Sequence, residues 1–142
     1  MYLVDHIQNR ILSDKFRTHF IRFPIKDTPQ IINQNALKVN WMELMNGKEP
    51  DYILGNPPFI GISQRSEDQT SELQEIWKSD YRGSLDYVTV WYRKAIEEAS
   101  DTHTQISFVS TNSICQGEQV YPLWSWITNQ QWEISFAHQT FK

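Results

Sequence analysis

Apolar positions divide the chain into helical and extended stretches. Apolar residues recur every three to four positions in four stretches, which predicts amphipathic helices over residues 2–16, 73–77, 85–99 and 119–128. Pro122 falls in the first turn of the last of these helices, where its missing N–H is tolerated. Residues 63–71 are polar and rich in Gln, Ser and Asp, and we expect them to form a mobile loop.

Short runs of β-branched and aromatic residues predict the strands. We expect strands over residues 31–39, 52–54, 104–110 and 132–141. A short polar linker with Trp41, Glu43 and Leu44 ends at Asn46 and Gly47, a strong turn signal. The resulting order of strands and helices, β, β, α, β, α, β, predicts an α/β sheet whose functional loops lie at the carboxyl ends of the strands.

Residues 51–61 are the stretch most difficult to explain as ordinary structure. A short apolar strand ends at Gly55, and Asn56-Pro57-Pro58-Phe59 follows. Each proline fixes φ, removes an N–H and biases the residue before it toward extended geometry. Asn56 and Pro57 therefore lie in a stiff, open segment whose carbonyls have few local donors.

This tetrapeptide has the groups needed to hold a planar base that carries an amino group. The Asn56 amide oxygen and the Pro57 carbonyl form a pair of acceptors for the two hydrogens of an exocyclic NH2. Phe59 adds a flat apolar face on which the base can stack. Holding both hydrogens draws the nitrogen lone pair out of conjugation, so the nitrogen becomes a nucleophile without a strong base. The alternative is a proline-rich turn after a strand, with a capping Asn.

Length, charge and cysteine content narrow the class of protein. The 142 residues fit one small domain or a piece of a larger one, with no apolar stretch near the roughly 18 residues of a membrane span and no secretory signal. Cys115 is the one cysteine, which fits a reducing cytoplasm. The net charge of −4 gives this segment no general attraction to nucleic acid, so a DNA substrate would need a grip from other segments.

The tetrapeptide resembles motif IV of the S-adenosylmethionine-dependent amino-methyltransferases that act on adenine N6 in DNA. Further stretches, in the same order, resemble the MmeI-like DNA methyltransferases, which are often fused to restriction nucleases in one polypeptide. These stretches are Leu3 to His6, Asn35 to Leu37 with Trp41, residues 51–61, 83–94, 108–118 and 136–142. The resemblance implies a site-specific DNA adenine-N6 methyltransferase, with S-adenosylmethionine as cofactor and DNA as partner, and a place in a restriction-modification system.

The resemblance also implies roles for individual residues. Asn56, Pro57 and Pro58 would form the catalytic segment, with Asn56 and the Pro57 carbonyl holding N6, and Phe59 would stack on the flipped adenine. Asn35 would lie near the cofactor adenine, where related enzymes often carry Asp. Gln34 stands where the family has Gly. Phe141 would offer an aromatic ring to the other face of the base, unless it is an ordinary core residue at a strand end.

Parts of a complete methyltransferase are not recognisable in the sequence. The five glycines include no G-x-G pair, so the glycine-rich turn that holds the cofactor is missing, as are the target-recognition segments. We therefore expect residues 1–142 to form part of a Rossmann-like class I methyltransferase sheet flanked by helices, without its first strands and its last ones. The isolated chain would be inactive, and its exposed sheet edges predict self-association.

Two alternative functions remain open. The same tetrapeptide occurs in enzymes that methylate RNA adenine or protein glutamine, and a truncated reading frame would give a non-catalytic remnant or interaction fragment. No metal site is expected, because His6, His19, His103 and His138 have no ligand spacing. Ser110, Thr111 and Ser113 lie in no G-x-S-x-G elbow, so they do not indicate a nucleophile.

Overall fold

The computed structural model describes residues 10–17 and 29–138. The chain divides into two compact units, residues 1–33 and 34–142. In the first unit, residues 10–16 are helical, within the helix predicted over residues 2–16, while residues 2–9 lie outside the described part. The tandem prolines, Pro57 and Pro58, and the predicted strand before them belong to the second unit.

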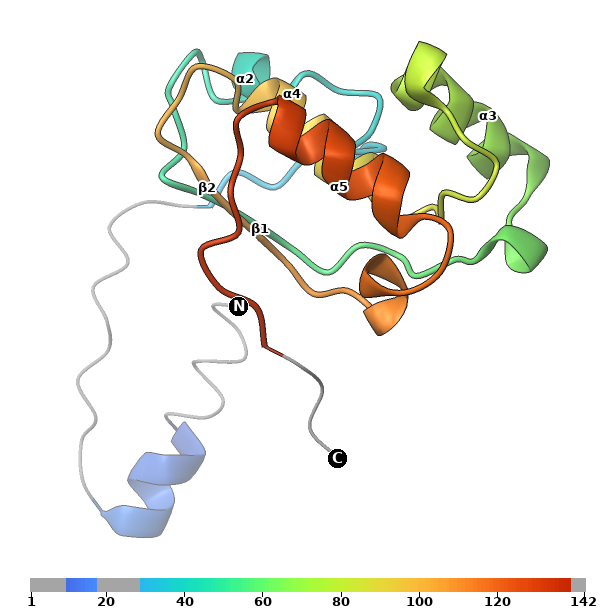
Figure 1. Ribbon diagram of the computed structural model, residues 1–142. Coiled ribbons are helices and arrows are strands. Elements are labelled where there is room, and N and C mark those ends of the chain that lie inside the picture. Colours follow the sequence, from blue (N-terminus) through green and yellow to red (C-terminus); the bar gives the residue numbers. More distant parts are fainter. Residues whose placement is uncertain (1–9, 18–28, 139–142) are drawn as a thin grey trace. The chain divides into compact units, whose positions relative to one another are not determined.

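Two short parallel strands form the sheet of the second unit. Strand β1 spans Tyr52–Gly55 and β2 spans Gln105–Phe108, in a register that pairs Tyr52 with Gln105 and Gly55 with Phe108 (Figure 1). A further bond at the carboxyl end joins Val109 N to Gly55 O at 3.0 Å. Because the strands are parallel, the loops that follow them leave the sheet at the same edge.

Helices connect and cover the two strands. The connection from β1 to β2 contains α3 (Glu67–Trp77) and α4 (Thr89–Glu98), with single 3-10 turns η1 (Ile62–Gln64) and η2 (Lys78–Asp80). After β2 come η3 (Asn112–Cys115) and α5 (Val120–Asn129), which contains Pro122 in its first turn, as predicted. Helix α4 packs against both α3 and α5 (Figure 1).

The hydrophobic core lies among these helices and on one face of the sheet. Its buried members come mainly from α3, the start of α4 and α5, and include Leu73, Trp77, Leu85, Val90 and Leu123. The two strands each bury only one face, on which Ile53, Gly55, Ile106 and Phe108 lie. The other face exposes Tyr52 and Leu54, whose exposed fractions are 62% and 72%.

Arg93 on α4 is a charged residue inside this core. Its guanidinium lies 5.0 Å from the ring centroid of Trp77 and 4.5 Å from that of Trp126. It also forms ion pairs with Asp80 at 2.8 Å and with Glu97 at 2.9 Å. The Trp77 and Trp126 rings also contact each other edge to face, with centroids 5.4 Å apart. Arg93 lies against both rings, so the three side chains join α3, α4 and α5.

Three predicted elements are wrong. Residues 31–39 form turns instead of a strand, and residues 132–138 of the predicted last strand have no regular structure. Residues 63–71 are not a mobile loop, because η1 occupies their start and α3 begins within them. The polar linker after residue 40 contains a short helix, α2 (Trp41–Leu44), before the predicted turn, in which Asn46 and Gly47 have φ of 54° and 71°.

The α/β class is confirmed as a mixed structure with a small parallel sheet.

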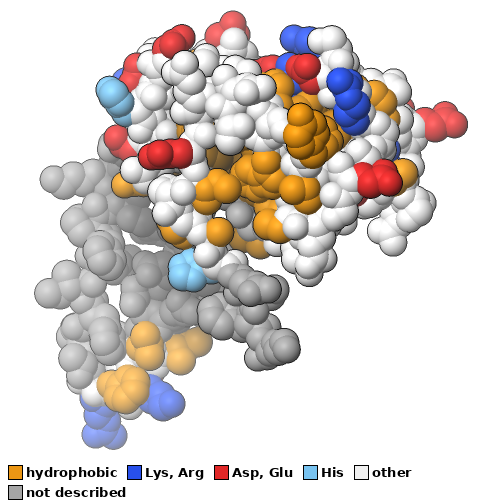
Figure 2. Space-filling view, in the orientation of Figure 1, with side chains coloured by type: hydrophobic (Ala, Val, Ile, Leu, Met, Phe, Trp, Pro, Cys, Tyr) orange, Lys and Arg blue, Asp and Glu red, His pale blue; other side chains and the backbone are white. Residues whose placement is uncertain are grey.

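Apolar side chains gather on the face shown in Figure 2, with charged side chains around them. Tyr121 of α5 is 81% exposed. Within residues 10–17 and 29–138, no helix is long and apolar enough to cross a membrane.

Candidate functional site

The tandem-proline segment, residues 56–59, leaves the carboxyl end of β1 as predicted. Asn56 and Pro58 are exposed, Pro57 is buried between them, and the Phe59 side chain is 41% exposed. Among the residues that the structure describes, neither the Asn56 amide nor the Pro57 carbonyl has a hydrogen-bond partner. Two oxygen acceptors therefore remain available at the sheet edge, held by backbone that the prolines stiffen.

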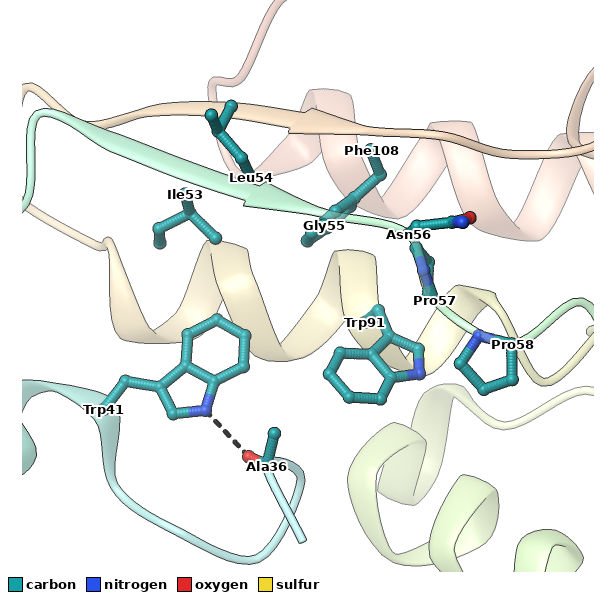
Figure 3. A pocket seen from close by; sticks show the side chains of 10 residues that line it. All are labelled: Ala36, Trp41, Ile53, Leu54, Gly55, Asn56, Pro57, Pro58, Trp91 and Phe108. Atoms are coloured by element: carbon teal, nitrogen blue, oxygen red, sulfur yellow. Dashed lines mark hydrogen bonds between the residues drawn. The ribbon is translucent and has the colours of Figure 1, made fainter. Parts of the chain in front are cut away.

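A cavity of about 320 Å³ lies beside the first three residues of this segment. We call it the indole cavity, because Trp41 and Trp91 form two of its walls (Figure 3). It is lined by Ala36, Trp41, Ile53, Leu54, Gly55, Asn56, Pro57, Pro58, Trp91 and Phe108. Flat aromatic and proline faces with few polar groups suit a planar ligand.

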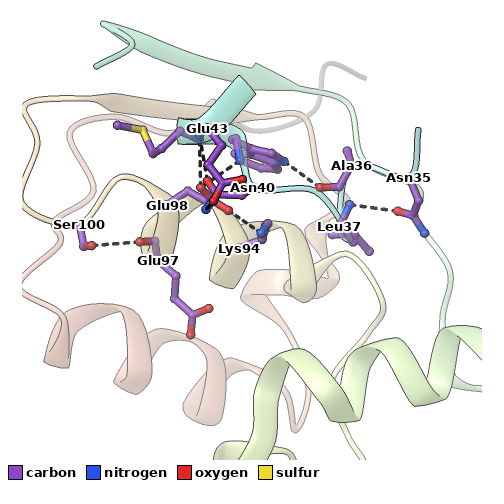
Figure 4. Close-up of polar contacts among 11 residues, drawn as sticks. Asn35, Ala36, Leu37, Asn40, Glu43, Lys94, Glu97, Glu98 and Ser100 are labelled. Carbon is purple, nitrogen blue, oxygen red and sulfur yellow. Dashed lines mark hydrogen bonds and ion pairs between the residues drawn. The ribbon is translucent and has the colours of Figure 1, made fainter. Parts of the chain in front are cut away.

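Hydrogen bonds fix the Trp41 wall of the indole cavity. Trp41 Nε1 donates to Ala36 O at 2.7 Å. Glu98 on α4 accepts hydrogen bonds from Trp41 N at 3.1 Å and Met42 N at 3.3 Å, which satisfies the first free N–H groups of α2 (Figure 4). Glu98 therefore ties α2, and with it the Trp41 ring, to α4.

The Trp91 wall carries an unused hydrogen-bond donor. Trp91 Nε1 is buried and has no partner among the described residues. A buried donor without a partner costs about 1–3 kcal/mol relative to a bonded one. Solvent does not reach this nitrogen, so a ligand in the indole cavity could bond to it only if the Trp91 ring or its neighbours moved.

Phe59 lines a second cavity, of about 210 Å³, which we call the Phe59 cavity. Its lining consists of Phe59, Ile60, Gly61, Asp86, Val88, Thr111 and Ser113. The loops after β1 and β2 thus meet here, together with the residues that precede α4. The tandem-proline segment separates the two cavities, because Asn56, Pro57 and Pro58 line one and Phe59 lines the other.

The chain after Phe59 is anchored to the segment before α4. Tyr87 N donates to Ile60 O at 3.1 Å, and Arg65 Nη1 donates to Leu85 O at 2.7 Å. A Cβ on Gly61 would lie 3.8 Å from Asp86 Oδ1, which is ordinary contact. These bonds hold the exposed Phe59 ring through its backbone neighbours.

Asn35, the predicted cofactor residue, lies beside the indole cavity without lining it. Its Nδ2 donates to Glu72 Oε1 at 2.9 Å, and its Oδ1 accepts from Leu37 N at 3.0 Å. Tyr87 also donates its hydroxyl to Glu72. Burial, and secondarily this hydrogen bond to Glu72, raise the pKa of Tyr87 well above its ordinary value. Phe141, the predicted second aromatic face, lies outside the described residues.

The sequence prediction located the tandem-proline segment but missed the walls around it. Trp41 was placed in a polar linker and Trp91 in the predicted helix over residues 85–99, and neither was predicted to line a site, although two such tryptophans are a usable signal for stacking. Within residues 10–17 and 29–138, no three His, Cys, Asp or Glu side chains lie where they would hold a metal ion.

Comparisons with known proteins agree on one family. Residues 1–142 match the family described as MmeI, DNA-methyltransferase domain. The chain is 32% identical, over 147 aligned residues, to DNA methyltransferase A of Bacillus subtilis strain 168, and the match covers 100% of the chain and 17% of that protein. A solved structure, the Type IIL restriction-modification enzyme MmeI in complex with DNA, is 40% identical with a TM-score of 0.72 and matches 90% of this chain and 17% of that one.

Proposed function

The chain belongs to the family of MmeI DNA-methyltransferase domains, and on that premise we propose that it is the central part of a longer enzyme that methylates adenine N6 in DNA. In this proposal the parent enzyme belongs to a restriction-modification system. The chain spans 17% of the length of both relatives, so cofactor-binding and target-recognition segments would come from the remainder of the parent.

One observation carries the proposal: at the carboxyl edge of the parallel sheet, the tandem-proline segment carries two oxygen acceptors without a partner among the described residues, followed in the chain by an exposed aromatic ring. The Asn56 amide oxygen and the Pro57 carbonyl would accept the two hydrogens of adenine N6. Phe59, 41% exposed, would stack on the ring of the flipped base. With both N6 hydrogens held, the lone pair is directed away from the ring, and orientation replaces a general base.

The indole cavity fits the adenine end of S-adenosylmethionine. Trp41, Trp91 and Pro58 offer flat faces on which a purine could stack. When bound, S-adenosylmethionine supplies the methyl group. Asn35 would contribute indirectly, because its side chain bonds to Leu37 and Glu72 and so holds Ala36 in the cavity wall.

DNA is the proposed macromolecular substrate. The solved MmeI structure is a complex with DNA. This chain carries a net charge of −4, so most of the phosphate contacts would come from other parts of the parent enzyme. The contribution of this segment would be the handling of one flipped base.

The test is to identify the methylated product. The full-length parent enzyme is incubated with labelled S-adenosylmethionine and, separately, with duplex DNA, RNA and bacterial protein extract, and the products are hydrolysed and analysed by mass spectrometry. We expect label in N6-methyladenine from DNA. Label only in RNA adenine or in protein glutamine would contradict the DNA assignment, and no label in any fraction would contradict the enzymatic one.

The proposal that this chain is one part of a divided site has its own test. Calorimetric titration of the isolated chain with S-adenosylmethionine should show no measurable binding, and sedimentation should show self-association through the exposed sheet face and edges. Micromolar binding by the isolated chain would contradict the proposal that the main cofactor elements lie elsewhere.

A further inference from the structure

Gln119, immediately before α5, uses its buried side chain to join two loops. It is 4% exposed. Its Oε1 accepts from Asp86 N at 3.0 Å, and its Nε2 donates to Asp86 Oδ2 at 2.6 Å and to Ser113 O at 2.9 Å. We call this arrangement of Gln119 and Asp86 the clasp. A buried amide with three bonds fixes the position of its partners, because each bond that is lost leaves a buried polar group unsatisfied.

Asp86 is the point at which the clasp meets the tandem-proline loop. The next residue, Tyr87, donates its N–H to Ile60 O at 3.1 Å, directly after Phe59. Thr89 donates its N–H and its hydroxyl to Asp86 O at 3.0 and 2.7 Å, which starts α4. The clasp therefore connects the loop after β1, the start of α4 and the loop after β2.

These connections surround the Phe59 cavity. Phe59, Asp86 and Ser113 all line this cavity. The clasp bonds directly to Asp86 and Ser113, and the bond from Tyr87 N to Ile60 O holds the backbone next to Phe59. The Phe59 ring is 41% exposed, so packing alone does not determine its orientation. Its orientation depends on the backbone of residues 59–61 and on the loop across the cavity.

We infer that Gln119 and Asp86 are positioning residues for methyl transfer. The clasp holds the loops after β1 and β2 in one arrangement, so that the Phe59 ring and the oxygens of Asn56 and Pro57 act on the same base. This inference rests on the proposed function. Asp86 then acts through its shape and its hydrogen bonds and not through its negative charge, because a neutral amide oxygen would also accept from Gln119.

The experiment measures steady-state methylation of DNA by the full-length parent enzyme and three variants. Gln119→Met removes all three bonds at nearly constant volume, and Asp86→Asn removes the charge but keeps the acceptor and the backbone N–H. Gln130→Met is the matched control, because Gln130 is exposed just after α5 and its side chain has no hydrogen bond among the described residues. Measured quantities are kcat, KM for DNA, the Kd for S-adenosylmethionine and the melting temperature.

We expect Gln119→Met to lower kcat by about 10- to 100-fold, the loss typical of a misplaced reacting group, with KM and cofactor Kd unchanged. Gln130→Met should keep kcat within about threefold of wild type, and Asp86→Asn, which keeps the acceptor and the backbone N–H, should lose less activity than Gln119→Met. The inference is overturned if Gln119→Met keeps full kcat, or if Asp86→Asn is as damaging as Gln119→Met. Full activity of all variants would leave the proposed function standing, whereas an inactive wild-type enzyme would contradict the proposed function itself.

A second variant serves if Gln119→Met does not fold. Gln119→Glu keeps an oxygen that accepts from Asp86 N but loses the Nε2 donor. A second carboxyl next to Asp86 is expected to have a raised pKa, so its protonated form regains a donor as the pH falls. Its kcat relative to wild type should therefore rise between about pH 8 and about pH 6. A constant ratio across this range would overturn the inference.

Discussion

Asn56 and Phe59 belong to the same tetrapeptide but line different cavities, Asn56 the indole cavity and Phe59 the Phe59 cavity. The buried Pro57 separates them. An adenine stacked on Phe59 would thus extend its amino group across the prolines toward the cavity proposed for the cofactor. In the proposed function, the two cavities would correspond to the two reactants of a transfer reaction, with the nitrogen that accepts the methyl group between them.

Replacing the Phe59 ring should weaken base binding. Stacking of a base on an aromatic side chain contributes about 1–3 kcal/mol, so Phe59→Leu should lower kcat/KM for DNA by roughly 5- to 150-fold. Phe59→Tyr keeps the flat face and should stay within about threefold of wild type. Steady-state kinetics of the parent enzyme measure both. The exposed Tyr121, changed to Leu, is the control, and equal activity of Phe59→Leu and Tyr121→Leu would exclude stacking on Phe59.

Changing Trp91 to Phe should affect the cofactor and not the base. The variant loses part of one flat cavity wall, and a lost stacking contact of about 1 kcal/mol corresponds to roughly a fivefold weaker Kd for S-adenosylmethionine. At saturating cofactor, kcat should be unchanged. Calorimetry and kinetics of the parent enzyme separate the two effects. A raised KM for DNA with unchanged cofactor Kd would assign the indole cavity to the base.

Several elements were predictable because their sequence carries a local signal that packing then reinforces. Helices α4 and α5 have apolar residues at helical spacing, and β1 and β2 have short apolar runs that pair with each other. Helix α3 was predicted only over residues 73–77, and its first six residues, 67–72, were missed although a start signal was present. Ser66 accepts from Gln69 N, and Gln69 returns a bond to Ser66 N in a capping box.

The two incorrectly predicted strands have the composition of a strand, but neither pairs with another strand among the described residues. Ile31 is 86% exposed and Ile134 is 61% exposed, and Leu37 is the residue of the first run that reaches the buried core of the described chain. A strand is stabilised by cross-strand pairs, which composition alone does not supply. The same limit applies to the site, because the walls at Trp41 and Trp91 and the bonds of Gln119 join segments far apart in the sequence.

Arg93→Lys should destabilise the second unit by about 1–2 kcal/mol, chiefly through loss of the planar contact with the Trp77 and Trp126 rings. The ion pairs add less, because the Asp80 and Glu97 side chains are 46% and 41% exposed. Urea unfolding of the 142-residue chain measures the loss. Arg82→Lys, at an exposed position, is the control and should stay within about 0.5 kcal/mol of wild type. Equal midpoints for both variants would show that the stacking contributes little.

Stability should fall at alkaline pH partly through Tyr87. Burial and Glu72 raise the pKa of Tyr87 in the folded state, whereas in the unfolded chain the pKa of this tyrosine is about 10. The contribution is therefore complete below about pH 10 and is lost as the pH rises further, because only the unfolded state releases the proton. Between about pH 10 and about pH 12, wild type should lose more stability than Tyr87→Phe. Tyr121→Phe, whose ring is 81% exposed, should behave as wild type. A parallel loss in Tyr87→Phe would contradict this assignment.

The most direct measurement compares methyl transfer to DNA by the parent enzyme with Asn56 intact and with Asn56→Ala, alongside the exposed control Asn129→Ala at the end of α5. The substitution removes one of the two oxygens proposed to hold N6 and leaves Trp41, Trp91 and Phe59 in place. We predict that Asn56→Ala abolishes transfer, while its Kd for S-adenosylmethionine and the activity of Asn129→Ala match wild type. Transfer by Asn56→Ala at the wild-type rate would contradict the account.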